Sequence, residues 1–424
     1  MARAPGDTHT VRNPGAGFAR DLAQARPMVV AALSAHLRDL DAAEEAFAEA
    51  CAALSEADAV PDNLAGWLIT VGKRKAIDAI RKRGAQQRAG ESAAYLEHPE
   101  GGDMGEVIEL PEPIADERLR LIFICCHPAL ALDARAALAL KVICGLPVSE
   151  IARLFLVPEP TMYQRITRAK AKIRDAGVSF ELPPRKAWDE RIEAVLLTLE
   201  LAYTAAYQDA AGSRPGNEGG ELAEEIERLA QILAALLPGE PEALGMAALV
   251  TLARSREGAR VDAAGAMVPL SKQDTARWDL ERVERARAWL DEAQSFERIG
   301  PYQIMAAIQL TQARRHFDGA TDWRAILALY EALMMLRPGP IVALNRVLAL
   351  AQVEGAARAL EELEALDLGS MEAARPVLVA RARLLEEAGR VDEALGFLNR
   401  ALGSDPARAE RLYLESWQKR LRRA

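Results

Sequence analysis

The sequence predicts an all-α protein of more than one domain. Half of its 424 residues are apolar and aromatic residues are few. Ala and Leu are abundant, while alternating β-branched runs are nearly absent, which is typical of helical proteins. The net charge is −9, which argues against a protein that coats nucleic acid over its whole surface. A chain of this length is too long to fold around a single hydrophobic core, so we expect two or three domains.

The first predicted helix spans residues 18–40, and a second follows it. Asp41 is the expected N-cap of this second helix, with Glu44 as its capping-box partner. Apolar positions fall on one face, and acidic side chains fall on the other. That acidic face fits a solvated surface, and it also fits a docking surface for a basic partner. The candidate binding residues of this helix are Asp41, Glu44, Glu45 and Glu49, together with Phe47 of its apolar face.

A turn-rich loop at residues 58–66 leads into a third helix that Asp62 or Asn63 begins. Leu64 and Trp67 open its apolar stripe, and Trp67 fits either the core or the border of a site for an unstacked base. The same helix then becomes strongly basic over residues 73–88, where seven cations face one acid, Asp78. Such an excess predicts a phosphate-binding surface. The candidate phosphate-binding residues are Lys73, Arg74, Lys75, Arg81, Lys82 and Arg83.

Residues 89–114 reverse the sign of the charge. From Glu91 to Glu117 the chain has nine acids, no Lys or Arg, and three prolines. This composition predicts an extended acidic linker between two domains, at residues 18–88 and 115–180. The negative charge of the linker would repel DNA and keep the linker soluble. Alternatively, the linker would imitate a nucleic acid in a basic channel.

The stretch LPVSEIARLFLVPEPTMYQRITRAKAKIR, at residues 146–174, predicts a helix-turn-helix. Ser149 is a plausible N-cap of its first helix, and Pro160 suits the first turn of its second. The second helix carries an apolar side with Met162 and Ile166, opposite a basic side without acids. A helix of this kind can enter the major groove of DNA, although a solvated helix hairpin fits the same residues. The candidate contacts are Thr161, Gln164, Arg165, Arg168 and Lys172.

No residue pattern predicts catalysis, a metal or a cofactor. P-loop, GxSxG and HExxH motifs are absent from the sequence, so we expect no enzyme. Cys125-Cys126-His127 has no fourth ligand at a useful spacing, so buried packing is favoured over zinc. The four cysteines lack the spacing of a disulfide framework and fit a reducing compartment. A polar N-terminus and the lack of a long apolar run predict a cytoplasmic protein without a membrane segment.

Residues 185–424 predict an acidic helical extension made of repeats. Gly319, Gly355 and Gly389 lie 36 and 34 residues apart, each between two helices. The unit from Ala382 to Pro406 has the tetratricopeptide pattern of paired helices. Repeats of this kind form surfaces for protein partners, and a scaffold that stabilises the front half of the chain is the alternative.

Taken in order, these segments resemble the extracytoplasmic-function sigma factors of bacterial RNA polymerase. DLDAAEEAFAEAC is similar to their clamp-binding helix, and PDNLAGWLITVGKRKAIDAIRKR to the segment that reads and opens the −10 element. The helix-turn-helix is similar to the unit that reads the −35 element. DERLRLIFICCHPAL, LSKQDTARWDLE and TDWRAILALYE resemble the subgroup that has a tetratricopeptide-like C-terminal extension.

The resemblance implies two partners, core RNA polymerase and promoter DNA, with a protein partner or an intramolecular contact for the extension. It assigns polymerase binding to the acidic face defined above. It assigns capture of a flipped base to Asp62, Asn63 and Leu64 beside Trp67, and promoter contacts to the two basic helices. A stand-alone helix-turn-helix regulator with a tetratricopeptide-like sensor domain is the alternative, and a repeat-based adaptor is a weaker one.

Overall fold

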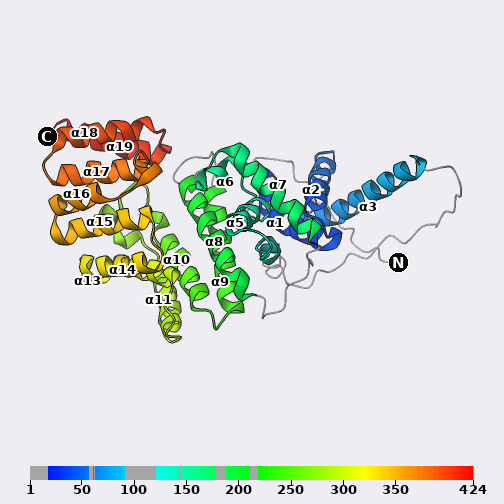
Figure 1. Ribbon diagram of the computed structural model, residues 1–424, viewed down its shortest axis with the longest axis horizontal. Coiled ribbons are helices and arrows are strands. Elements are labelled where there is room, and N and C mark those ends of the chain that lie inside the picture. The colour runs from blue at the N-terminus through cyan, green and yellow to red at the C-terminus, as the bar shows by residue number, and fades with distance from the viewer. Residues whose placement is uncertain are drawn as a thin grey trace, which may run out of the picture. The chain divides into compact units, whose positions relative to one another are not determined.

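The computed structural model describes residues 18–56, 61, 63–90, 121–143, 145–155, 157–176, 188–210 and 218–423. The described residues are helical, apart from turns, loops and one isolated antiparallel bridge between Val261 and Met267, so the all-α prediction is confirmed (Figure 1). The chain forms two compact units, residues 1–201 and 202–424. None of the described helices combines the length and the apolar character needed to cross a membrane.

Three helices form the first bundle of the first unit. They are α1 (Phe18–Leu37), α2 (Leu40–Ser55) and α3 (Leu64–Gly90). Val29, Leu33 and Leu68 are buried where they meet. A Cβ on Gly72 would lie 3.0 Å from Leu33 Cδ1 and 3.3 Å from the Ala46 carbonyl oxygen. The missing side chain therefore allows α3 to approach both neighbours closely.

The start of α2 differs from the prediction. Asp39, not Asp41, is its N-cap, because the Asp39 carboxylate accepts hydrogen bonds from the backbone N–H groups of Asp41 and Ala42. Asp41 instead lies in the first turn with its side chain exposed. The two aspartates are equivalent as capping residues, so the sequence could not rank them. The shift leaves the Asp41 carboxylate available for a contact outside its own helix.

The second bundle of the first unit contains the predicted helix-turn-helix. Its helices are residues 121–125, α5 (Leu132–Val142), α6 (Val148–Leu154) and α7 (Glu159–Asp175). Pro160 lies in the first turn of α7 as expected, but Pro147 rather than Ser149 is the N-cap of α6. Phe123, Leu138, Ile151 and Met162 are buried in this bundle. Gly145 joins α5 to α6 with a φ of +66°, a conformation that favours glycine.

Helix α8 (Asp189–Ala210) begins against the helix-turn-helix bundle. The centroid of the buried Trp188 ring lies 4.8 Å from the centroid of the Phe123 ring. Arg191 donates a hydrogen bond to the Phe123 carbonyl oxygen at 2.9 Å. The start of α8 is therefore part of the first unit.

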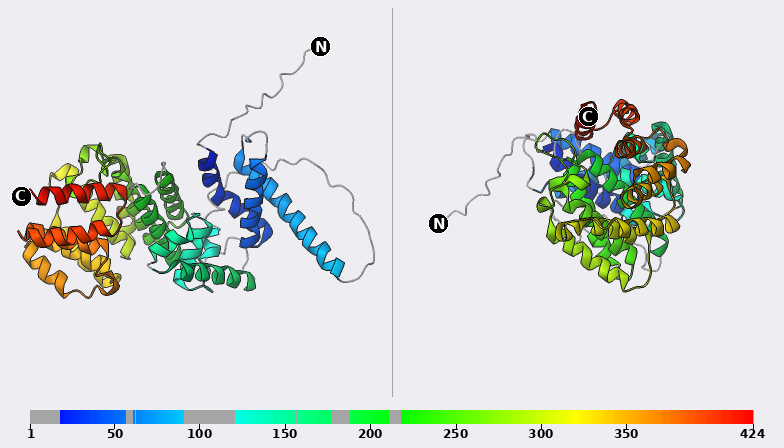
Figure 2. Two further views of the ribbon diagram at one scale, coloured as in Figure 1. Left: turned by 90° about the horizontal axis from the view of Figure 1, so that it is seen from above. Right: turned by 90° about the vertical axis from the view of Figure 1, so that its left-hand side faces the viewer.

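The second unit is a succession of helices stacked on one another, as the yellow-to-red part of Figure 2 shows. Its principal helices are α9 (Glu218–Leu236), α10 (Pro241–Ser255), α11 (Leu280–Gln294), α12 (Pro301–Ala313), α13 (Arg315–Asp318), α14 (Trp323–Leu336), α15 (Pro340–Glu354), α16 (Ala356–Ala365), α17 (Arg375–Glu387), α18 (Val391–Gly403) and α19 (Arg408–Leu421).

From α14 onward, each helix packs on the next one along the chain, with the 3-10 turn η5 (Gly369–Met371) between α16 and α17. Gly319, Gly355 and Gly389 each adopt a positive φ between helices, at +72°, +95° and +79°. These are the helix-ending glycines that the sequence indicated. The tetratricopeptide assignment itself stays a prediction.

A buried ion-pair network joins three helices of the second unit. Glu227 of α9 is 6% exposed, and its carboxylate lies 2.9 Å from Arg254 Nε of α10 and 3.2 Å from Arg282 Nε of α11. Removing one member of a buried ion pair leaves the other charges without compensation, which costs more than the pair itself contributes.

Replacing Glu227 with Ala should therefore lower the free energy of unfolding by about 3 kcal/mol or more. Chemical denaturation followed by circular dichroism measures this loss. Glu224→Ala is the matched control, because Glu224 lies on the same helix with its side chain exposed. Equal losses in the two variants would show that the network does not stabilise the unit.

Candidate functional site

Helix α3 presents basic side chains to solvent over the part of the helix whose side chains the structure describes. Arg74, Lys75 and Arg81 are exposed, and Lys73 is half-buried. Lys82 and Arg83 continue the same helix, but their side chains lie outside the described residues. Ala76 and Leu68 are buried on the opposite side of the helix. The apolar side therefore holds α3 in its bundle and leaves the cations turned toward solvent.

The first turn of α3 is held by Asn63. Its side-chain oxygen accepts a hydrogen bond from the Gly66 backbone N–H at 2.9 Å, so Asn63 begins the helix as one of the two predicted candidates. A Cβ on Gly66 would lie 2.7 Å from Asn63 Nδ2, so a larger residue would disturb this cap. Leu64 and Trp67 pack half-buried on the core of the bundle. Asp62 lies outside the described residues.

The predicted polymerase-binding face lies on α2. Asp41 and Glu45 are exposed, whereas Glu44 and Glu49 are half-buried. Phe47 packs partly buried on the bundle core, and the Arg26 guanidinium lies 5.9 Å from its ring centroid. The acidic side chains therefore reach the surface of α2, while Phe47 lies toward the bundle core, and binding of polymerase by these residues stays a prediction.

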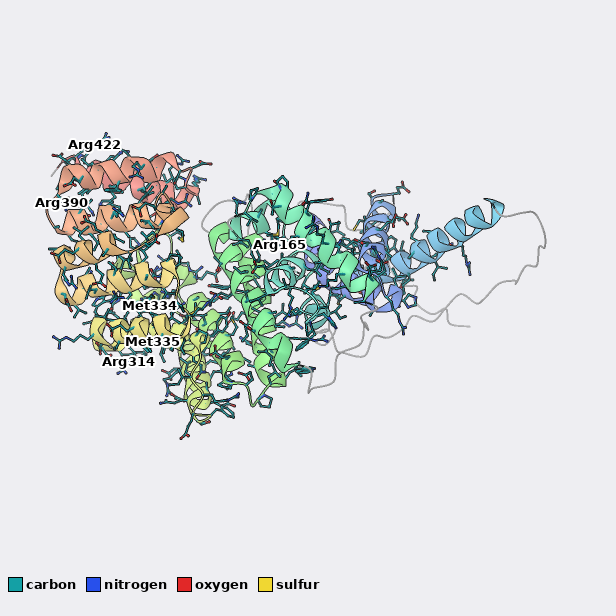
Figure 3. The ribbon with its side chains drawn as sticks, in the orientation of Figure 1. Arg165, Arg314, Met334, Met335, Arg390 and Arg422 are labelled. Carbon is teal, nitrogen blue, oxygen red and sulfur yellow. The ribbon has the colours of Figure 1, made fainter. Side chains whose placement is uncertain are left out.

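Helix α7 buries Met162, Ile166, Ala169 and Ile173 and exposes much of its opposite side. The exposed predicted contact residues are Thr161, Gln164, Arg168 and Lys172. Arg165 differs from them, because its side chain is 25% exposed and lies 3.6 Å from an Asp133 oxygen. Its guanidinium also lies 5.7 Å from the Phe155 ring centroid. Arg165, labelled in Figure 3, therefore helps to hold α7 on α5 and α6.

An ionic bridge, formed by Arg26, Asp41, Glu44, Lys170 and Arg174, joins α7 to the first bundle. Lys170 Nζ lies 2.9 Å from Asp41 Oδ1 and also pairs with Glu44. Arg174 reaches the other Asp41 oxygen at 3.7 Å, and Arg26 pairs with Glu44 at 2.8 Å. Two acids predicted to bind polymerase are therefore held by a helix predicted to bind DNA.

The electrostatics of Lys170 favour its charged form. Burial alone would lower the pKa of Lys170, but hydrogen bonds and attraction from Glu44 and Asp41 outweigh burial and raise it above its ordinary value. The ammonium group therefore stays charged throughout the neutral range. Because Asp41 and Arg174 are about half exposed, added salt screens their part of the bridge.

Sequence reasoning missed three bridge residues as site residues, namely Arg26, Lys170 and Arg174. Arg26 lies on α1, and it also donates to the Lys141 and Val142 carbonyl oxygens of α5, each at 3.4 Å. Its signal in the sequence is a cation beside Ala25 and Val29, two of the apolar positions of the first helix. Lys170 follows the buried Ala169, at the edge of the apolar side, and its partners lie 126 and 129 residues away along the chain.

The adjacent cysteines are buried, as their sequence context indicated. Burial raises the pKa of Cys126 to about 12, although Thr198 and two arginines act in the opposite direction. The Cys126 thiol is therefore protonated at neutral pH. Cys144 lies outside the described residues.

Comparison with known families accounts for both bundles. Residues 22–86, which include most of α1 and α3 and all of α2, match the model described as "Sigma-70 region 2". Residues 120–173, which include the helix-turn-helix, match "Sigma-70, region 4". The chain belongs to the sigma-70 family of RNA polymerase sigma factors. Core RNA polymerase and promoter DNA are accordingly the partners of this sigma factor.

The extension is shared with a relative of unknown role. Residues 191–294 of this sigma factor match a family of unknown function, DUF6596. Over 398 residues, it is 38% identical to "Uncharacterized protein R00370" of Rhizobium meliloti (strain 1021), an alignment that covers 93% of each chain. The similarity therefore includes both the sigma regions and the extension. No solved structure matches the chain.

The ionic bridge predicts a zero-length cross-link. A carbodiimide should couple Lys170 to Asp41 or Glu44, because their charged groups touch, and mass spectrometry of tryptic peptides would detect the product. The yield should fall several-fold between 0.1 M and about 1 M salt, where the screening length shrinks from about 10 Å to about 3 Å. Lys172 is the matched control, since it is exposed on the same helix. Equal coupling of Lys172 to these acids, or coupling of Lys170 that salt leaves unchanged, would rule out the bridge.

Proposed function

We propose that this sigma factor is of the extracytoplasmic-function type, directs core polymerase to a specific set of promoters and opens their −10 region. The observation that carries the proposal is the presence of two exposed cationic helices, α3 and α7, in the two matched sigma regions. Phosphate contacts from such helices hold DNA, and side chains at base edges give sequence preference. The extension of residues 185–424 is proposed as a regulatory or protein-interaction module.

In this proposal, α2 docks on a basic surface of polymerase through Asp41, Glu44, Glu45, Phe47 and Glu49. Asp41 and Glu44 are already paired with Lys170. Docking that uses these two acids must therefore displace Lys170. The displaced cation would then be available to DNA, so binding of polymerase and exposure of α7 would be coupled. The coupling comes from competition for the same carboxylates.

Opening of the promoter is proposed to occur at the start of α3. A base that leaves the duplex loses stacking worth a few kcal/mol, and a pocket that binds the extruded base offsets this cost. Asn63 is exposed beside the half-buried Trp67, so a base could contact its amide while a ring edge lies against Trp67. Lys73, Arg74, Lys75, Arg81, Lys82 and Arg83 would hold the flanking phosphates. The factor itself would carry out no covalent chemistry and would not be an enzyme.

Recognition of the −35 element is proposed for α7. Thr161, Gln164 and Arg168 are exposed on its outer side and would approach base edges and phosphates. Arg165 would contribute in part through its contacts with Asp133 and Phe155, which set the position of α7. Arg168 is therefore a cleaner probe of DNA contact than Arg165.

Run-off transcription with purified core polymerase tests the proposal. Core polymerase plus this chain should start transcription at defined promoters, whereas core polymerase alone should not. Arg168→Ala should weaken promoter binding about tenfold, because it removes a contact worth roughly 1–3 kcal/mol, and should leave polymerase binding unchanged. Arg324→Ala is the charge-matched control, since Arg324 is exposed on α14 of the second unit.

A stand-alone helix-turn-helix regulator would give the opposite result. It would bind its operator equally well without polymerase and would add no initiation to core polymerase. An equal loss of polymerase and promoter binding in Arg168→Ala would remove the assigned role of α7.

The role of the extension is tested by ending the chain after Ala210. The truncated chain retains α8, whose first residues pack on Phe123, and lacks α9 to α19. We expect promoter output to change while the helical content of residues 1–210 is retained, as measured by run-off transcription and circular dichroism. Unchanged output with an intact first unit would mean that the extension has no part in transcription.

A further inference from the structure

A cavity of about 310 Å³ lies within the second unit. It is lined by residues of α12, α14, α15 and α17 and by Arg315 of α13. Leu270, Ser271 and Thr321, which lie outside these helices, complete the lining. This volume lies at the small end of the range for protein sites that bind small molecules. The cavity therefore suits a metabolite-sized ligand better than a large one.

Arg315 supplies a positive charge that pairs with no carboxylate in the part of the chain that the structure describes. One of its N–H groups donates to the Gln273 carbonyl oxygen at 2.9 Å, and its guanidinium lies 5.2 Å from the Trp278 ring centroid. Partial burial lowers the pKa of Arg315 from its ordinary value, and no carboxylate of the described part of the chain raises it again. Arginine stays charged even so, and it has five N–H donors in all. It can therefore bind an anion with the donors that remain.

The other charged residues of the cavity neutralise each other. Arg383 Nε lies 3.0 Å from a Glu387 oxygen, and both residues belong to α17. The net charge of the lining is therefore +1. A ligand with one negative charge matches this value, whereas a polyphosphate would bring more negative charge than the lining can offset and a cation would be repelled.

The remaining walls combine aromatic rings with amides. Trp323 and Tyr330 of α14 line the cavity together with Leu348 and Leu384. Burial raises the pKa of Tyr330 to about 12, so its phenol is neutral at physiological pH. Gln312 and Asn345 add uncharged groups that can donate or accept hydrogen bonds. These walls suit a planar apolar body with one or two polar atoms.

We propose that this cavity is a binding site for a small aromatic carboxylic acid, with its carboxylate on Arg315 and its ring against Trp323 and Tyr330. The site goes beyond the function proposed above and does not rest on it, since all of its residues belong to the extension. A ligand there would contact α12, α14, α15 and α17 at once. It would therefore stabilise the folded second unit, and the free energy of stabilisation would rise with the logarithm of the ligand concentration once that exceeds Kd.

The test uses the full chain with indole-3-acetate and phenylacetate, each compared with its neutral amide by isothermal titration calorimetry. Each acid should bind. Its amide should bind at least about tenfold more weakly, because a charge-assisted hydrogen bond is lost. Arg315→Gln should weaken binding of the acids about tenfold. Arg314→Gln, at a neighbouring exposed arginine that pairs with Asp318, should leave the affinity unchanged. Arg314 is labelled in Figure 3.

Asn345→Ala provides a second cavity variant that leaves Arg315 and its contacts in place. It should weaken binding of the acids without changing the preference for acid over amide. Binding of neither acid, equal binding of acid and amide, or equal effects of Arg314→Gln and Arg315→Gln would each overturn the proposal. Because the amide comparison uses the unchanged chain, it remains decisive even if Arg315→Gln fails to fold.

Discussion

Helix α7 has to bury Met162, Ile166, Ala169 and Ile173 on one side, and this constraint determines what each of its cations can do. A residue opposite the buried side, such as Arg168, projects into solvent. A residue at the edge of the buried side meets neighbouring helices instead. Arg165 meets Asp133 and Phe155, while Lys170 meets Asp41 and Glu44. Burial of four apolar side chains thus separates outward-facing cations from structural ones.

The ionic bridge gives the first unit two uses for the same carboxylates. Asp41 and Glu44 belong to the acidic face of α2, and they also hold Lys170 of α7. Ion pairs of partly exposed groups are individually weak and are screened by salt, so a strong basic partner can replace them at little cost. A contact of this strength fits the proposed docking of α2 on polymerase, which would displace Lys170 from these carboxylates. A buried apolar interface between the same helices would resist such exchange.

The second unit combines buried ionic and apolar contacts with the cavity beside Arg315. The Glu227 network and the almost fully buried α10 hold its first helices together. Farther along, helices α15 to α19 pack in succession around a core that includes Val347, Leu384 and Leu414. Of the two arginines that line the cavity, Arg383 pairs with Glu387, whereas Arg315 has no carboxylate partner among the described residues. Arg315 is therefore the lining residue at which we propose that an anionic ligand binds.

The sequence by itself determined the helical class, the helix-turn-helix with its buried and basic sides, the basic half of α3, and the glycines that end the repeat helices. These features depend on residues within a few turns of one another, so local periodicity and turn chemistry reveal them. Only the tertiary structure decided between Asp39 and Asp41 as the cap of α2, paired Lys170 with acids more than 120 residues away, and turned Arg165 toward Asp133. It also gathered Arg315, Trp323 and Asn345 around one cavity. Contacts between distant segments depend on how helices pack in three dimensions, and the periodicity of a single helix carries no information about its partners.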